Sequence, residues 1–272
     1  MSSFSAWRTT FSAALFLSCS LAVADVPQLN TKQLNEQAVM ANVWVQNSGE
    51  YRALSYQAFN LAHLSLDHYL ATYTGDKKIA IVVDADETVV NNSAYNAWQI
   101  GKDQGYSGKT WQKWMKAEQA TAMPGAKAFL NYVKSRGAEV FYITNRSEKG
   151  LQATASNLKA LGYPFVDDVH MMLKTTTSDK EARRQKVLES YDIALFMGDN
   201  LSDFTNEFYQ QGFEQAAHAV DKNKALFGTK YIMLPNPMYG DWEGKVYDEN
   251  WSLSPQQKSN ARKAALKPWS GE

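Results

Sequence analysis

An apolar run that ends in clustered acids constrains this chain more than any other stretch. Five small or β-branched apolar residues at positions 79–83 are followed by Asp84, Asp86 and Glu87. Such a run is typical of a strand that is buried on both faces in the middle of a parallel sheet. The acids then lie at the carboxyl edge of the sheet, where open α/β sheets build their sites. Because like charges this close repel one another, the pattern also predicts a cation beside them, most simply a divalent metal.

The rest of the chain alternates between strands and helices. Four further apolar runs read as strands, at residues 140–143, 171–173, 193–197 and 231–234. Segments of helical character separate them. This alternation predicts an α/β fold, a Rossmann-like parallel sheet with helices on both faces.

The sequence also suggests how the chain is divided. We expect residues 76–272 to form the α/β core, with a cap insertion around residues 95–122. Residues 25–75 carry apolar residues at helical spacing and have no catalytic constellation. They are expected to form the N-terminal helical part of a small cap, which is built largely from these helices.

Residues 1–24 have the features of an export signal. A positive charge at Arg8 precedes a mostly apolar segment, and Ala22-Val23-Ala24 forms an A-x-A cleavage site. Cleavage near Ala24 predicts a periplasmic or secreted protein. The only cysteine, Cys19, leaves an alternative, an outer-membrane lipoprotein that is anchored at this residue. A membrane partner is expected only in that case.

The charge balance limits the classes of partner. Lys and Arg together number 28, and so do Asp and Glu. A balanced chain has no global field that would attract a nucleic acid polymer or an anionic membrane. We therefore expect small-molecule partners and no nucleic acid, and the sequence leaves a homodimer open.

Polar residues of the kinds used in catalysis follow four successive predicted strands. They are Asp84 and Asp86, then Thr144, then Lys174 or Lys180, and finally Asp199 with Asp203. Each of them alone is commonplace in a turn or on a solvated helix. In a parallel sheet, however, they would meet at one edge and form a single site.

The order of these residues resembles the haloacid-dehalogenase-like phosphohydrolase superfamily. More narrowly, residues 82–88 with Tyr95, together with residues 198–204, resemble the bacterial class C acid phosphatases, which are exported or lipid-anchored enzymes. The resemblance covers nearly all of the chain after the signal. Two departures are Val90, where the family usually has Leu, and residues 175–177, three threonines where the family tends to be lysine-rich.

The resemblance implies a phosphomonoesterase that works through its aspartates. Asp84 would attack phosphorus and form an aspartyl-phosphate, and Asp86 would be the general acid and base. Asp86 must then be protonated when substrate binds, which suits an acidic pH optimum. Mg²⁺ would be held by Asp84, Asp199 and the backbone carbonyl of Asp86, while Asp203 would orient a metal-bound water.

The same resemblance implies how phosphate and substrate are bound. Thr144 and the N–H groups near Asn145 would bind phosphoryl oxygens, and a lysine would neutralise the remaining charge. The family pattern Ser-x-Lys before a helix favours Lys180 over Lys174.

The implied substrates are nucleoside 5'-monophosphates. Trp111 and Tyr239 would clamp the base, and Tyr95 and Trp98 are weaker candidates for lining the pocket. The alternative for Trp111 and Tyr239 is ordinary packing.

Other functions on the same fold remain in view. A haloacid dehalogenase would not need Asp86, and a phosphomutase-like transferase fits poorly with export. An alternative of a different class is a non-catalytic periplasmic binding or storage protein. Such a protein would be expected to lack some of the catalytic residues. The expected acids are all present.

Overall fold

The computed structural model describes residues 28–271 and contains a five-stranded sheet of order β5-β4-β1-β6-β7. All four neighbouring pairs in it are parallel. The strands are β1 (Lys78–Val83), β4 (Glu139–Ser147), β5 (Met171–Lys174), β6 (Tyr191–Gly198) and β7 (Tyr231–Met233). Each corresponds to one predicted apolar run, and the acid-terminated run forms the central strand. The predicted parallel α/β sheet is therefore confirmed.

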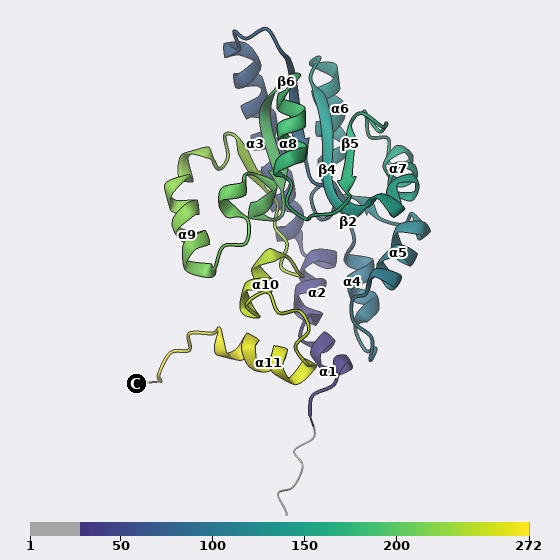
Figure 1. Ribbon diagram of the computed structural model, residues 1–272, viewed down its shortest axis with the longest axis vertical. Helices are drawn as coiled ribbons and strands as arrows, with labels where there is room; N and C mark the ends of the chain where they lie inside the picture. The colour runs from purple at the N-terminus through teal and green to yellow at the C-terminus, as the bar shows by residue number, and fades with distance from the viewer. Residues whose placement is uncertain (1–27, 272) are drawn as a thin grey trace, which may run out of the picture.

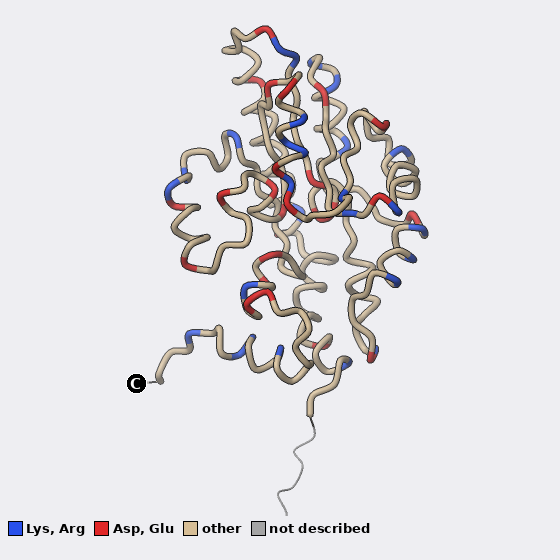
Figure 2. Tube along the Cα trace, viewed as in Figure 1, with Lys and Arg blue, Asp and Glu red and all other residues tan. Residues whose placement is uncertain are grey.

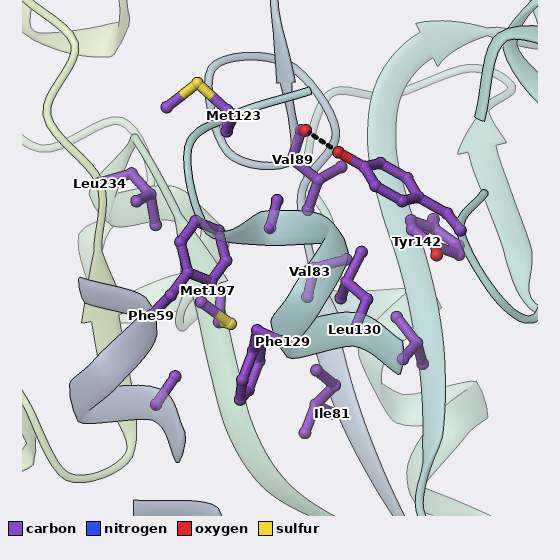
Figure 3. Packing of buried hydrophobic residues seen from close by; sticks show 14 of the residues in the cluster. Phe59, Ile81, Val83, Val89, Met123, Phe129, Leu130, Tyr142, Met197 and Leu234 are labelled. Carbon is purple, nitrogen blue, oxygen red and sulfur yellow. Dashed lines mark hydrogen bonds between the residues drawn. The ribbon is translucent and has the colours of Figure 1, made fainter. Parts of the chain in front are cut away.

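Helices cover both faces of the sheet because alternate residues of the buried strands point in opposite directions. Ile81 and Val83 of β1 pack in one core cluster with α3 (Gly49–Thr72), α6 (Ala126–Ser135) and α7 (Leu151–Ala160). Figure 3 shows Phe59 and Phe129, from the first two of these helices, beside Met197 of β6.

The opposite face has its own core. Ala80 and Val82 of β1 pack in a second cluster with residues of α8 (Glu181–Leu188) and α9 (Phe213–Lys222). In Figure 1, α8 lies in front of the central sheet and α3 lies behind it. The predicted placement of helices on both faces is confirmed.

The remaining helices lie beyond the carboxyl ends of the strands, in the lower half of Figure 1. They are α1 (Thr31–Glu36), α2 (Val39–Asn47), α4 (Ser93–Gln99), α5 (Gly108–Ala117), α10 (Asp241–Val246) and α11 (Pro255–Ala264). Contacts join α1 to α11 and α2 to α4. Short 3-10 helices occupy Glu148–Gly150, Leu201–Asp203, Asn206–Phe208 and Lys224–Leu226.

A small ribbon closes the base of the segment that carries α4 and α5. Strands β2 (Val90–Asn91) and β3 (Thr121–Ala122) pair in antiparallel fashion. The segment around residues 95–122 follows β2, carries α5 and most of α4, and ends with β3. The sequence does not reveal this ribbon, because two-residue strands leave no periodic pattern.

The N-terminal helices differ from the expectation that they mainly build a cap. The long helix α3 contacts β6, β7 and α6, and its buried residues join the core cluster of the sheet. It therefore belongs to the layer that covers the sheet. Of the three N-terminal helices, only α1 and α2 lie beyond the strand ends, and α2 contacts α4 of the insertion (Figure 1).

Several sequence-based expectations concern residues 1–27, which lie outside the described part of the chain. They include the export signal, the cleavage site near Ala24 and the lipid-anchor alternative at Cys19. Among residues 28–271, no helix combines the length and the apolar character needed to cross a membrane. Figure 2 shows basic and acidic residues interspersed along the trace.

Candidate active site

Two adjacent strands bring the central acids together. Asp84 follows β1 and Asp199 follows β6, and the Asp84 N–H donates to the Met197 carbonyl at 2.9 Å. Asp203 completes the group, and one carboxylate oxygen of each of the three aspartates lies within 4.8 Å of the others. All three side chains are buried. The structure thus brings together three of the acids that the sequence predicts to share an edge.

Asp203 reaches this position because Gly198 has no side chain. A Cβ at residue 198 would lie 2.2 Å from the Asp203 carboxylate, so any larger residue would displace it. The Asp203 Oδ2 atom accepts from the Asn200 N–H at 3.0 Å, and its Oδ1 accepts from Lys180 Nζ at 2.6 Å. Both oxygens are therefore held by protein donors.

The structure distinguishes the two candidate lysines. Lys180 is buried, and its Nζ donates to Asp84 Oδ1 at 2.5 Å as well as to Asp203. Burial acts to lower the pKa of Lys180, but Asp203 and Asp84 outweigh it and raise that pKa. Lys174 is only half-buried, and its Nζ lies 3.5 Å from Ser178 Oγ. Lys180 is the lysine that contacts the acids.

Two oxygens of the acid group have no hydrogen-bond donor among the described residues. Asp199 Oδ2 accepts from Asn200 Nδ2 at 2.9 Å and from Asn236 Nδ2 at 2.8 Å, whereas its Oδ1 accepts no hydrogen bond from the described residues. Asp84 Oδ2 likewise accepts none from them. The free Asp199 oxygen is the donor type that a hard divalent cation prefers, and beside it Asp84 keeps one carboxylate oxygen to which no described residue donates.

The electrostatics of the group also fit a cation. Burial raises the pKa of Asp84 to about 7, Lys180 opposes this shift, and Asp203 and Asp86 add to it. Burial, together with Asp203 and Asp84, also raises the pKa of Asp199 well above its usual range. Lys180 alone therefore leaves excess negative charge in a buried site, which a divalent metal would offset.

Asp86 lies apart from the three grouped carboxylates. Arg146 donates to its Oδ1 from Nη2 at 2.7 Å and from Nε at 2.9 Å. Asn92 Nδ2 donates to the same oxygen at 2.8 Å. The Asp86 side chain is therefore engaged by a buried arginine, and the role of its backbone carbonyl as a metal ligand stays a prediction.

Glu87 forms a second buried acid beside the site. Its carboxylate accepts from the Asn92 N–H at 2.6 Å and from the Tyr239 hydroxyl. Burial raises the pKa of Glu87 to about 8, and Asp86 adds to the shift. Tyr239, which was predicted to clamp a base, is thus half-buried with its hydroxyl anchored next to the acids.

Thr144 and Asn145 are successive residues of β4, so their side chains point to opposite faces of the sheet. Thr144 is buried within β4, which continues to Ser147, and its Oγ1 accepts from the Arg146 N–H at 3.1 Å. Its hydroxyl donates to none of the described residues, so its proton is available to a ligand. Asn145 is exposed and donates to the Ser178 carbonyl at 2.9 Å, and it accepts from Arg183 Nη2 at 2.8 Å. The Asn145 side chain is therefore engaged elsewhere, which leaves backbone N–H groups for the predicted phosphoryl contact.

The predicted pocket residues of the insertion form an aromatic cluster. The Tyr95 ring meets Trp111 edge-on at 5.0 Å and stacks on Trp98 at 5.9 Å. Tyr95 is buried, and its hydroxyl is 2.9 Å from Thr110 Oγ1. The Trp111 ring lies 5.6 Å from the Arg146 guanidinium, which joins this cluster to Asp86.

Sequence reasoning missed several residues that hold the site. Arg146 and Asn92 bind Asp86, Asn236 binds Asp199, and Arg184 is buried with its Nη1 donating to the Ser202 carbonyl at 3.0 Å. Period-two alternation after Thr144 is the signal that would have placed Arg146 in the interior.

With this geometry established, the comparisons with known proteins identify the family. The model of the HAD superfamily, subfamily IIIB (acid phosphatase), matches residues 6–242. The chain belongs to this acid phosphatase family. The resemblance that the motifs indicated is thereby confirmed.

Solved structures in the family are similar over most of this chain. The class C acid phosphatase from Bacillus anthracis is 43% identical, with a TM-score of 0.84 over 87% of this chain and 99% of that chain. The same enzyme with tungstate bound has 43% identity, a TM-score of 0.83 and the same coverage of 87% and 99%.

A more distant relative comes from a plant. Acid phosphatase 1 from Solanum lycopersicum is 25% identical over 162 residues, which are 58% of this chain and 57% of that protein. The chain thus matches somewhat more than half the length of that relative.

Proposed function

We propose that this chain is an exported, Mg²⁺-dependent acid phosphatase that hydrolyses nucleoside 5'-monophosphates through an aspartyl-phosphate on Asp84. The observation that carries the proposal is the free oxygen of Asp84 at the end of the central strand. It lies in a buried group with Asp199 and Asp203 that Lys180 neutralises only in part.

In the first step, the free oxygen of Asp84 attacks phosphorus while the bond from phosphorus to the leaving oxygen breaks. Asp86 gives its proton to that leaving oxygen. In the second step, Asp86 takes a proton from the attacking water, and the bond from phosphorus to Asp84 breaks.

The phosphoryl group carries negative charge that the site must offset. Lys180, which contacts Asp84, supplies one fixed positive charge. The Thr144 hydroxyl and backbone N–H groups near Asn145 donate to phosphoryl oxygens. A Mg²⁺ ion held by Asp199 and by the Asp84 oxygen that does not attack, with Asp203 outside its direct ligands, would screen the approach of the carboxylate to the phosphate. The tungstate-bound relative supports an oxyanion as the bound species.

The substrate class rests on the aromatic side chains near the acids. Trp111 lies within the aromatic cluster and next to Arg146, and Tyr239 is anchored on Glu87. Stacking between aromatic side chains tolerates any base and contributes roughly 1–3 kcal/mol per base. Nucleotides are therefore favoured as substrates.

Phosphate release from a panel of phosphomonoesters tests the proposal. The panel contains AMP and a small aryl phosphate at about pH 5–6, with and without EDTA. We expect release that EDTA abolishes and Mg²⁺ restores. No release from any member would overturn the proposal and favour a non-catalytic binding protein on the same fold.

A further inference from the structure

The two oxygens of Asp86 have unequal surroundings. Oδ1 accepts from Arg146 Nη2 at 2.7 Å, from Arg146 Nε at 2.9 Å and from Asn92 Nδ2 at 2.8 Å. Oδ2 receives, from the described residues, only the longer contact of Arg146 Nε at 3.2 Å. A carboxylate oxygen has two lone pairs, so Oδ1 is saturated by its donors and has no room for a proton. Oδ2 is the oxygen that can carry one.

Arg146 is itself held rigidly. Its side chain is only 2% exposed, and its Nη1 donates to Thr154 Oγ1 at 3.2 Å. Its Nη2 also donates to Asn92 Oδ1 at 3.2 Å, an oxygen that accepts from Trp114 Nε1 at 2.7 Å as well. The guanidinium thus donates to helix α7 and to the loop after β2, and the ring of Trp111 in the insertion lies 5.6 Å from it.

We propose that Arg146 is a positioning residue for proton transfer, which holds Oδ1 of Asp86 so that Oδ2 carries the proton to the leaving oxygen. The inference rests on the proposed function, in which Asp86 is the general acid. The proton leaves Oδ2 as the bond from phosphorus to the leaving oxygen breaks and that oxygen keeps the electron pair. It returns to Oδ2 from water in the second step.

The planar geometry of the Arg146 guanidinium contributes to the positioning of Asp86, in addition to its positive charge. Two nitrogens of one planar group fix both the distance and the plane of the carboxylate, whereas the ammonium group of a lysine is a single point of attachment. A charge alone would leave the Asp86 carboxylate free to rotate, and then either oxygen could face the leaving group.

Substrates with different leaving groups test the proposal. An unactivated alkyl phosphate needs its leaving oxygen protonated, whereas dinitrophenyl phosphate has a stable leaving anion and needs little protonation. We expect Arg146→Gln to lower the single-turnover rate of leaving-group release from the alkyl phosphate by roughly 10²-fold or more, the range of general-acid contributions, and from the dinitrophenyl ester by less than about tenfold. Single-turnover rates isolate the first step, because hydrolysis of the aspartyl-phosphate needs Asp86 as its base with either substrate. The substrate concentration that gives half the maximal rate should change little for both.

Three further variants complete the experiment. Asp86→Asn should show the same selective loss. Arg136→Gln is the matched control, because Arg136 is an exposed arginine paired with Asp67 before the start of β4. It should leave both rates unchanged. Arg146→Lys keeps the buried charge in case the glutamine variant does not fold, and we expect a smaller loss in the same direction.

The outcomes separate this inference from the proposed function. Equal losses on both substrates in the Arg146 variants would make Arg146 merely structural, and an alkyl phosphatase rate of the lysine variant equal to the wild type would also overturn the proposal. A selective loss in Asp86→Asn without one in Arg146→Gln would reject the inference and leave the function standing. No selective loss in Asp86→Asn would reject Asp86 as the general acid and the inference with it.

Discussion

Asp84 and Asp86 are two positions apart, yet each has a different cationic partner. Lys180 contacts Asp84, whereas Arg146 contacts Asp86. A lysine offers a mobile point charge, which suits a carboxylate whose other oxygen must attack. An arginine offers a fixed fork, which suits a carboxylate that must keep one orientation. The environments of the two acids thus separate the proposed roles of nucleophile and proton carrier.

Replacement of Lys180 should affect both stability and activity. Lys180→Met leaves Asp84 and Asp203 buried without a cation, and removal of one partner from a buried ion pair costs roughly 3–5 kcal/mol. We expect the free energy of unfolding, measured in urea without added metal, to fall by an amount of this order. We expect phosphate release to fall to background.

Lys174→Met is the matched control for this experiment. Lys174 is half-buried and contacts only Ser178 among the hydrogen bonds of the described residues. A substitution of this kind usually changes stability by no more than about 0.5 kcal/mol. If Lys174→Met lost activity and Lys180→Met kept it, the assignment of the lysine would be wrong.

At the scale of elements, local pattern was sufficient to predict the strands, although β4 continues beyond its predicted run to Ser147. A run such as residues 79–83 needs burial on both faces wherever it occurs, and strands that alternate with helices have few other arrangements. This is why Asp84, Thr144 and Asp199 could be expected at one edge. The family resemblance then pointed to Lys180 before any contact was known.

Long-range contacts explain what the sequence could not reveal. Asn236 donates to Asp199, which is 37 residues away in the sequence, and Arg146 donates to Asp86, which is 60 residues away. Contacts between residues so far apart in the sequence leave no local pattern. Helix α3 covers the sheet because its apolar side fits the core, but its amphipathic spacing suits a cap equally well. The role of such elements depends on the packed whole.

Helix α5 carries the residue that most directly tests the substrate class. Trp111→Ala should raise KM for a nucleoside monophosphate by about tenfold or more, because stacking is worth roughly 1–3 kcal/mol per base. KM for a small phenolic phosphate should change much less. Steady-state kinetics on both substrates measure the difference. The exposed Trp269, which is 81% accessible, provides a control in Trp269→Ala that should change neither value. An equal rise on both substrates would remove Trp111 from the base clamp.

At the scale of the whole molecule, the buried acids make stability depend on pH. The pKa values of Asp84 and Glu87 are raised to about 7 and about 8, mainly by burial. In the unfolded chain both groups ionise near pH 4, so the folded protein holds protons that the unfolded chain has released. The free energy of unfolding therefore falls as the pH rises from about 4 to about 8.

Thermal unfolding of the metal-free protein measures this dependence. We expect Tm to fall between about pH 5 and about pH 8, and added Mg²⁺ to recover part of the loss at the upper end, because the ion binds the ionised carboxylates. The lowered pKa values of Glu139 and Asp167 act in the opposite direction, but only below about pH 4.5. A Tm that stays level or rises across this range would contradict the assignment of these buried acids.

The central claim is that Asp84 carries the phosphoryl group, and trapping the intermediate tests it most directly. The Asp86→Asn variant should form the aspartyl-phosphate from dinitrophenyl phosphate, which needs no general acid, but hydrolyse it slowly, because no general base activates the water. Acid quenching and peptide mass spectrometry should then find one phosphoryl group on the peptide that contains Asp84, and none when Asp84 is also replaced by Asn. A phosphoryl group on another residue, or full turnover by Asp84→Asn alone, would contradict the account.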